Sequence, residues 1–186
     1  MEPALLSECL ADRNTSLRVE PIDHRSVRFI STLMDTFRSP AGENRIHDLL
    51  LEGVLSIPDL TILSIRAEAI EQPFRACDAS VEPMKRLEGV RIGPGFRQTV
   101  VEKIGGVQGC SHFLSMALDL GALHTLTTYL QMEAEAPRQG EGADDGRWMA
   151  IGLRVEPRLV DACIGLARES PVIQAAQRRL SGLDSH

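Results

Sequence analysis

Residues 26–70 alternate apolar and polar side chains in three successive stretches, and this pattern constrains the fold more than any other feature of the chain. A strand with one covered face has this period of two. We therefore expect strands at residues 26–37, 45–57 and 61–70. The connecting segments at 39–44 and 57–60 are short and contain the turn formers Pro, Gly, Asn and Asp. Short connections join antiparallel neighbours, so the sequence predicts an antiparallel meander of three strands or more.

Helical spacing replaces this alternation after Pro73. We expect helices at residues 81–87, 96–104 and 111–132, and two more that begin at Pro157 and Pro171. Strands followed by helices are typical of an α+β fold with the helices packed on one face of the sheet. We predict a loosely ordered segment at residues 1–20 and a single α+β domain at 21–186, with a mobile linker at 137–147 that is rich in Gly, Glu and Asp.

Composition limits the classes of function. The 186 residues are 43% hydrophobic and 25% charged, with a net charge of −6, which is ordinary for a globular protein. The chain has no dense Lys/Arg cluster, so we expect no nucleic-acid partner. No apolar run reaches the roughly 18 residues of a membrane span, and residues 1–4 lack the basic start of a signal peptide. We expect no membrane association, and a cytoplasmic location in which the four cysteines are reduced thiols.

The segment Gly105-Gly106-Val107-Gln108-Gly109-Cys110-Ser111-His112 combines turn-forming glycines with a thiol and an imidazole at the start of a predicted helix. A helix N-terminus presents free N–H groups and favours anions such as a thiolate. We expect Ser111 to cap this helix. Cys110 falls on the apolar stripe of the helix, which favours core packing, and the alternative is an activated thiol or a metal ligand. The motif is not a nucleotide-binding fingerprint, because it follows a helix and lacks the G-x-G-x-x-G spacing.

His47 lies on the apolar face of its predicted strand, with Arg45 expected on the same face. A sheet face covered by helices is also where the Cys110-Ser111-His112 segment must pack. We therefore predict that His47 and His112 meet, and that they form a catalytic site with Arg45. An imidazole gains or loses a proton near neutral pH, as acid–base catalysis requires.

Other side chains are candidates for substrate or metal binding. Arg97 can hold a carboxylate or phenolate, and Arg75 is a second candidate for that role. Cys110, Ser111 and Tyr129 complete the predicted substrate-binding set. The alternative is a zinc or iron–sulfur site made of Cys77, Cys110, His112 and Cys163, although their spacing matches no paired Cys-x-x-Cys motif.

An ordered series of motifs resembles a bacterial family catalogued as a domain of unknown function. The series runs Arg45-Ile46-His47-Asp48, Ala67-Glu68-Ala69, Pro73-Phe74, Cys77, Leu87-Glu88-Gly89, Gly95-Phe96, Gly105-Gly106 and Gly109-Cys110-Ser111-His112, with Cys163 near the C-terminus. The chain departs from the family's pattern at Met34-Asp35-Thr36-Phe37, where an Asp-Gly-x-Trp-like segment is expected. The resemblance implies a role in bacterial catabolism of lignin-type aromatics, and lyases that release formaldehyde.

We predict two alternative functions. The first, whose reaction and substrate class are what the resemblance implies, is a cofactor-independent lyase that uses histidine acid–base catalysis to cleave a C–C bond in a hydroxylated, lignin-derived aromatic molecule and release formaldehyde. The second is a metal-binding or carrier module built on the cysteines and His112. The apolar long helix also suits a homodimer.

Overall fold

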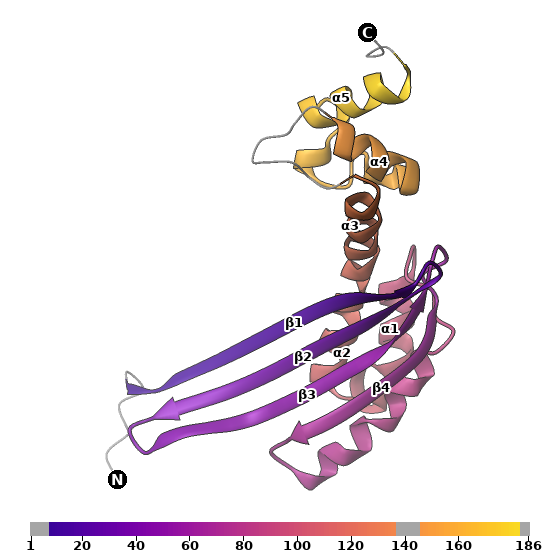
Figure 1. The fold of residues 1–186 in the computed structure, drawn as a ribbon. Helices are drawn as coiled ribbons and strands as arrows, with labels where there is room; N and C mark the ends of the chain where they lie inside the picture. Colours follow the sequence, from indigo (N-terminus) through magenta and orange to yellow (C-terminus); the bar gives the residue numbers. More distant parts are fainter. Residues whose placement is uncertain (1–7, 137–145, 183–186) are drawn as a thin grey trace. The chain divides into compact units, whose positions relative to one another are not determined.

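The computed structural model describes residues 8–136 and 146–182. Its contacts divide the chain into two compact units, Met1–His124 and Thr125–His186, whereas the sequence predicted one domain from residue 21 onward. The first unit contains a sheet and the helices that cover it, and the second is helical (Figure 1). In the part of the chain described here, no helix is both long and apolar enough to cross a membrane.

The sheet is a four-stranded antiparallel meander of the order β1-β2-β3-β4. Its strands are β1 (Leu10–Asp23), β2 (Ser26–Ser39), β3 (Gly42–Ser56) and β4 (Ile62–Glu71). The last three confirm the predicted strands to within a few residues. β1 corrects the expectation of a loosely ordered N-terminal segment as far as residues 10–20 are concerned, while residues 1–7 lie outside the described part. β1 is mostly exposed, and its few apolar residues show no clear alternation with polar ones. The sequence pattern therefore did not predict this strand.

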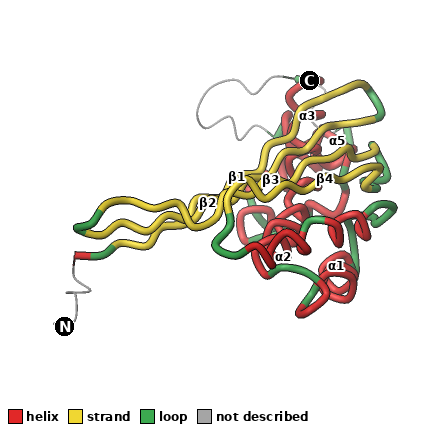
Figure 2. The backbone as a smooth tube through the Cα atoms, turned by 90° about the horizontal axis from the view of Figure 1, so that it is seen from below, coloured by secondary structure: helices red, strands yellow, loops and turns green. Residues whose placement is uncertain are grey.

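Helices cover one face of the sheet (Figure 2). The other, open face carries exposed side chains such as Arg28 and Arg66. The buried positions of β2 and β3 recur with the predicted period of two: Val27, Phe29, Ser31 and Leu33 in β2, and Leu49, Leu51 and Leu55 in β3. On the open face Glu52 pairs with Arg28 and Arg66 from the neighbouring strands. Figure 2 shows that the outer ends of β1, β2 and β3 run beyond the helices. The predicted α+β class, with helices on one sheet face, is confirmed.

The close packing of this face depends on Gly53 in β3, which lies opposite Phe29 in β2. A Cβ atom at Gly53 would fall 2.6 Å from Phe29 Cζ and 2.1 Å from the backbone oxygen of Ser64. The missing side chain therefore makes room for the fully buried phenyl ring.

Short helices follow the sheet in the first unit. They are the 3-10 helices η2 (Arg75–Ser80), η3 (Glu82–Leu87), η4 (Gly106–Gln108) and η5 (Leu120–Ala122), and the α-helices α1 (Phe96–Ile104) and α2 (Ser111–Asp119). α1 has the predicted bounds and ends at Gly105. The long helix predicted at 111–132 is instead interrupted by η5, which separates α2 from α3 (Leu123–Glu135). Gly121 lies at this interruption, where its backbone freedom disfavours a continuous helix.

The second unit continues from α3 with α4 (Arg147–Val155), η6 (Pro157–Leu159), η7 (Ile164–Leu166) and α5 (Pro171–Leu180). Its core gathers apolar side chains such as Met132, Met149 and Ile173. The helix at Pro171 is as predicted, whereas the one at Pro157 is a single 3-10 turn and α4 was not predicted. Of the expected linker, residues 137–145 lie outside the described part and Arg147 already begins α4.

Candidate functional site

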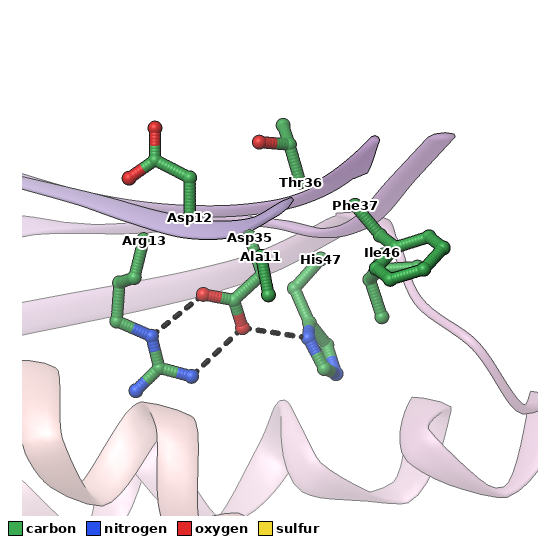
Figure 3. Close-up of a pocket in the computed structure, with 8 residues that line it drawn as sticks. All are labelled: Ala11, Asp12, Arg13, Asp35, Thr36, Phe37, Ile46 and His47. Carbon is green, nitrogen blue, oxygen red and sulfur yellow. Dashed lines mark hydrogen bonds and ion pairs between the residues drawn. The ribbon is translucent and has the colours of Figure 1, made fainter. Parts of the chain in front are cut away.

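A row of three polar side chains crosses the covered face of the sheet near the ends of its strands (Figure 3). Arg13 in β1 lies opposite Asp35 in β2, and Asp35 lies opposite His47 in β3. Arg13 donates hydrogen bonds from Nε to Asp35 Oδ1 at 2.6 Å and from Nη2 to Asp35 Oδ2 at 2.7 Å. His47 Nδ1 lies 2.9 Å from Asp35 Oδ2. The strand register thus places one carboxylate between a guanidinium and an imidazole.

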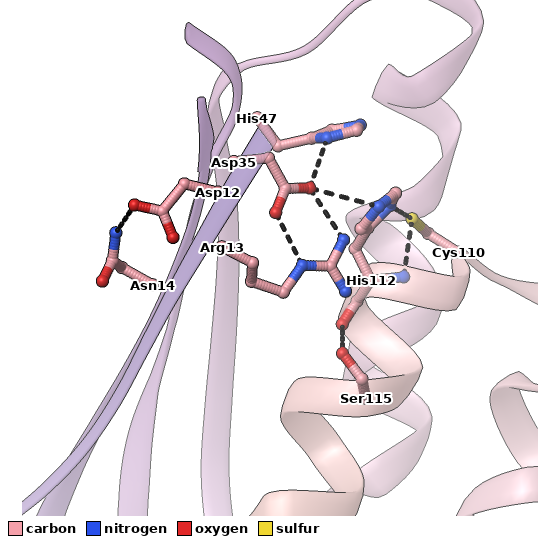
Figure 4. A network of polar contacts seen from close by, with 8 residues as sticks. All are labelled: Asp12, Arg13, Asn14, Asp35, His47, Cys110, His112 and Ser115. Atoms are coloured by element: carbon pink, nitrogen blue, oxygen red, sulfur yellow. Dashed lines mark hydrogen bonds and ion pairs between the residues drawn. The ribbon is translucent and has the colours of Figure 1, made fainter. Parts of the chain in front are cut away.

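A second imidazole reaches this row from the first turn of α2 (Figure 4). His112 Nε2 lies 3.5 Å from Asp35 Oδ2, and the ring centroids of His47 and His112 are 3.9 Å apart. The predicted contact between the two histidines is therefore present. The carboxylate that joins them was not predicted.

Cys110 rather than Ser111 caps α2. The Cys110 thiol accepts a hydrogen bond from the backbone N–H of His112 at 3.4 Å, and Sγ lies 3.5 Å from His112 Nδ1. Ser115 Oγ donates to the backbone oxygen of His112 at 2.8 Å. These bonds fix the first turn of α2 and the direction of the His112 ring, and the expectation of a Ser111 cap was wrong.

A β-bulge explains why Arg45 does not join the site. The pairing of β2 with β3 shifts after Asp35, so that Asp35 pairs with His47 but Thr36 pairs with Arg45. Ile46 is therefore an extra residue on β3, and it changes the alternation that placed Arg45 and His47 on one face. Arg45 instead forms an ion pair with Asp48 at 2.7 Å. The guanidinium at the site comes from Arg13 on the strand that the sequence did not predict.

The cluster has a defined charge distribution. The Arg13 hydrogen bonds hold the pKa of Asp35 below its ordinary value despite partial burial, and the neighbouring histidines act in the same direction. Burial is the main cause that lowers the pKa of His112, with further contributions from the charges of His47 and Arg13 that outweigh Asp35. At neutral pH Asp35 is therefore ionised and His112 is neutral.

Asp35 and Arg13 were missed, although one signal for Asp35 was available in the sequence. Asp35 continues the series Val27, Phe29, Ser31, Leu33 at every second position, so the alternation itself places a carboxylate on the covered face. An acidic side chain at such a position is rarely buried without a partner. The identity of the partner depends on the register of β1, which the sequence pattern does not reveal.

The remaining predicted site residues lie elsewhere. Ser111 is exposed at the start of α2, and Arg97 is exposed in the first turn of α1. Tyr129 stacks on Trp148 in the second unit, with centroids 5.5 Å apart. Cys163 is exposed in the same unit. The predicted metal set of Cys77, Cys110, His112 and Cys163 does not form a ligand group within residues 8–136 and 146–182.

Asp35, His47 and His112 form the one group in the described parts of the chain with metal-ligand geometry, because a donor atom from each lies within 4.8 Å of the others. Two histidines and a carboxylate are a common ligand set for divalent transition metals. The bidentate Arg13 bond opposes such binding, since the guanidinium already occupies both carboxylate oxygens and would repel a cation.

A pocket of about 440 Å³ lies beside this cluster, lined by Arg13, Asp35 and His47 together with the apolar side chains of Ala11, Phe37 and Ile46 (Figure 3). The pocket therefore places apolar surface next to groups that exchange protons, an arrangement that suits a small organic substrate.

The fold and the site together define an α+β protein whose antiparallel sheet carries an Asp–His pair faced by a histidine from a helix. A family model described as "Protein of unknown function (DUF2889)" matches residues 12–125. The chain belongs to this family, and the matched segment contains Arg13, Asp35, His47 and His112. No curated protein and no solved structure is detectably similar to this chain.

Proposed function

We propose that the protein is a lyase that cleaves a C–C bond in a hydroxylated, partly aromatic small molecule and releases formaldehyde by acid–base catalysis. The observation that carries this proposal is the contact of two histidines with one carboxylate beside a pocket lined by both polar and apolar residues. The reaction class comes from the family resemblance, and the geometry supplies the groups that such a reaction needs.

His47 is the base in this scheme. Its Nδ1–H donates to Asp35, which leaves the Nε2 lone pair for the proton of the substrate's CH₂OH group. The carboxylate stabilises the imidazolium that forms when His47 takes this proton. Arg13 is a positioning residue, because it holds Asp35 through both oxygens.

His112 is the acid. It is neutral at pH 7 and donates from Nε2 to the oxygen that leaves the benzylic carbon. The Cys110 thiol, 3.5 Å from His112 Nδ1, returns a proton to the ring and becomes a thiolate. This role explains why a thiol and an imidazole stand two residues apart at the start of the helix.

The bond changes balance without an oxidant or a reductant. The benzylic C–O electron pair leaves with the oxygen, which takes a proton, while the para-phenolate supplies electrons to form a quinone methide. His47 then takes the hydroxyl proton, and the O–H pair becomes the C=O of formaldehyde. The C–C pair becomes a new C=C bond as the ring returns to a phenolate. The scheme is redox-neutral, so it involves no electron-transfer cofactor.

Release of formaldehyde from a hydroxymethyl-bearing biaryl by purified, chelator-treated protein tests the proposal. We expect His47→Gln and His112→Gln each to lower kcat by about 10²-fold or more, since general acid–base catalysis contributes about 10² to 10⁴ in rate. His24→Gln is the matched control, because His24 is exposed at the β1–β2 turn. Absence of formaldehyde with any such substrate, in a folded sample, contradicts the proposal.

A metal centre is the second candidate, favoured by the mutual approach of Asp35, His47 and His112 to within 4.8 Å. Metal analysis of protein purified without added metal separates the two functions. Near-stoichiometric metal that is lost in Asp35→Asn supports the metal centre. Metal-free protein that still releases formaldehyde supports the lyase.

The cytoplasmic location and the homodimer remain predictions from the sequence. All four cysteines are free thiols in the structure. Light scattering of the purified protein tests the dimer, and a mass of one chain at micromolar concentration would contradict it.

A further inference from the structure

A second pocket, of about 590 Å³, lies between the η2–η3 segment and the loop that leads into α2. Two large apolar side chains on its rim are strongly exposed: Phe74 has 69% of its surface accessible, and Val107 is fully exposed. Both line the same pocket. Paired exposed apolar side chains over a hollow are typical of a binding surface for an apolar group.

Arg86 gives this pocket a fixed positive charge. Its Nη1 donates to the backbone oxygens of Lys103 at 3.1 Å and of Gln108 at 3.2 Å. These two bonds hold one corner of the guanidinium against α1 and η4, while Nε and Nη2 make no hydrogen bond within the described residues. A guanidinium held in this way offers two parallel N–H donors, which match a carboxylate or a phenolate oxygen.

One residue, Cys110, links this pocket to the acid–base cluster. Cys110 lines the pocket, and its Sγ lies 3.5 Å from His112 Nδ1. A ligand in the pocket therefore sits one side chain away from the histidine that faces Asp35. The pocket also contains a second thiol, Cys77.

We infer that this pocket binds an anionic aromatic ring, with Phe74 and Val107 against the ring and Arg86 bound to its carboxylate or phenolate oxygen. The inference rests on the proposed function only in assigning this ring to the non-reacting end of the lyase substrate. Arg86 then takes the role that the sequence had given to Arg97 or Arg75. Neither of those two side chains lines this pocket.

Binding is tested without turnover by NMR titration of the full chain with benzoate, with 4-nitrophenolate at pH 8, and with neutral benzyl alcohol. We expect shifts of the amides of residues 74–80 and 106–110 with at least one of the two anions. Benzoate alone identifies a carboxylate ligand, and 4-nitrophenolate alone identifies a phenolate. Equally tight binding of benzyl alcohol, or no shift with either anion, overturns the inference.

Two variants separate the contribution of the Arg86 charge to binding affinity from that of the apolar Phe74 side chain. Arg86→Gln should weaken binding of the anion by about tenfold or more, as loss of a charge-assisted pair does. Phe74→Ala removes an exposed ring without disturbing the core and should weaken both anionic and neutral probes. Lys85→Gln and Ile70→Ala are the matched controls, because Lys85 precedes Arg86 in η3 and Ile70 is an exposed apolar residue of β4. Unchanged affinity in both Arg86→Gln and Phe74→Ala overturns the inference.

The same variants distinguish this inference from the proposed function. If the protein releases formaldehyde, we expect Phe74→Ala to raise KM and leave kcat nearly unchanged. Anion binding without any formaldehyde release would reject the proposed lyase function but support the proposed binding of an anionic ring in this pocket. Formaldehyde release with an unchanged KM in both Arg86→Gln and Phe74→Ala would reject substrate binding in this pocket but support the lyase function.

Discussion

At the scale of single residues, Asp35 connects the whole candidate site. Its carboxylate contacts Arg13, His47 and His112, and its side chain is only 15% exposed. A group with three partners in a partly buried position controls both the orientation and the charge of its neighbours.

We predict that Asp35→Asn lowers kcat for formaldehyde release by about 10²-fold or more, because an amide neither stabilises a His47 imidazolium nor keeps the ion pair with Arg13. The measurement is steady-state kinetics with the hydroxymethyl-bearing biaryl. Asp48→Asn is the control, since Asp48 pairs with Arg45. Equal kcat in the two variants would remove Asp35 from the mechanism.

The proton affinity of His112 supplies a second prediction. Burial, followed by the charges of His47 and Arg13, lowers its pKa, so its NMR titration midpoint should lie below about 6.5. In the unfolded chain the pKa is higher, and so the stability contributed by this group is complete above about pH 6.5 and is lost as the pH falls through the folded pKa. His47→Gln should raise the midpoint and Asp35→Asn should lower it further. The opposite order of the two midpoints would contradict this charge distribution.

At the scale of elements, burial decides which strands the sequence pattern reveals. β2, β3 and β4 were predictable because their covered face repeats every second residue, and the meeting of His47 with His112 followed from that face. β1 is mostly exposed, so its sequence shows no alternation that predicts a strand. The contribution of Arg13 to the site therefore could not be predicted either. The bulge at Ile46 is a local change of register that the alternation of side chains does not predict. Because of it, the prediction that Arg45 lies on the same face as His47 was wrong.

The β2–β3 pair also supplies a stability prediction. Gly53→Ala would place a Cβ 2.1 Å from the Ser64 backbone oxygen and 2.6 Å from Phe29 Cζ, and such overpacking costs about 1–3 kcal/mol. Gly121→Ala is the contrasting variant. A Cβ there meets nothing within 4 Å, so it should be neutral or stabilise by up to about 1 kcal/mol. Urea unfolding measures both, and a Gly53→Ala free energy of unfolding equal to the wild-type value would contradict the packing argument.

At the scale of the whole molecule, the chain carries two separate sets of internal contacts, Met1–His124 and Thr125–His186. Every group of the acid–base cluster and of the Arg86 pocket belongs to the first unit. The second unit has its own apolar core. Two cores in one chain favour unfolding in more than one step.

The single tryptophan makes this division measurable. Trp148 belongs to the second unit and stacks on Tyr129, so its fluorescence reports on that unit alone. We predict that Gly53→Ala lowers the unfolding midpoint reported by NMR signals of amides in the sheet and leaves the fluorescence midpoint nearly unchanged. An equal shift of both signals would show that the two units unfold as one.

The hairpin that joins β1 to β2 lies far along the strands from Asp35, yet it determines which side chain meets that carboxylate. The Asp23 carboxylate accepts hydrogen bonds from the backbone of Arg25 and the hydroxyl of Ser26, which sets the pairing of the two strands. The pairing of β1 with β2 already shifts between Pro21 and Asp23, next to this turn. A change in turn length that slides β1 by one position beyond this irregularity would rotate Arg13 to the opposite side of the sheet. The length of a surface turn is therefore a remote determinant of the contact between Arg13 and Asp35, and a natural insertion or deletion there would mark a relative that lacks this contact.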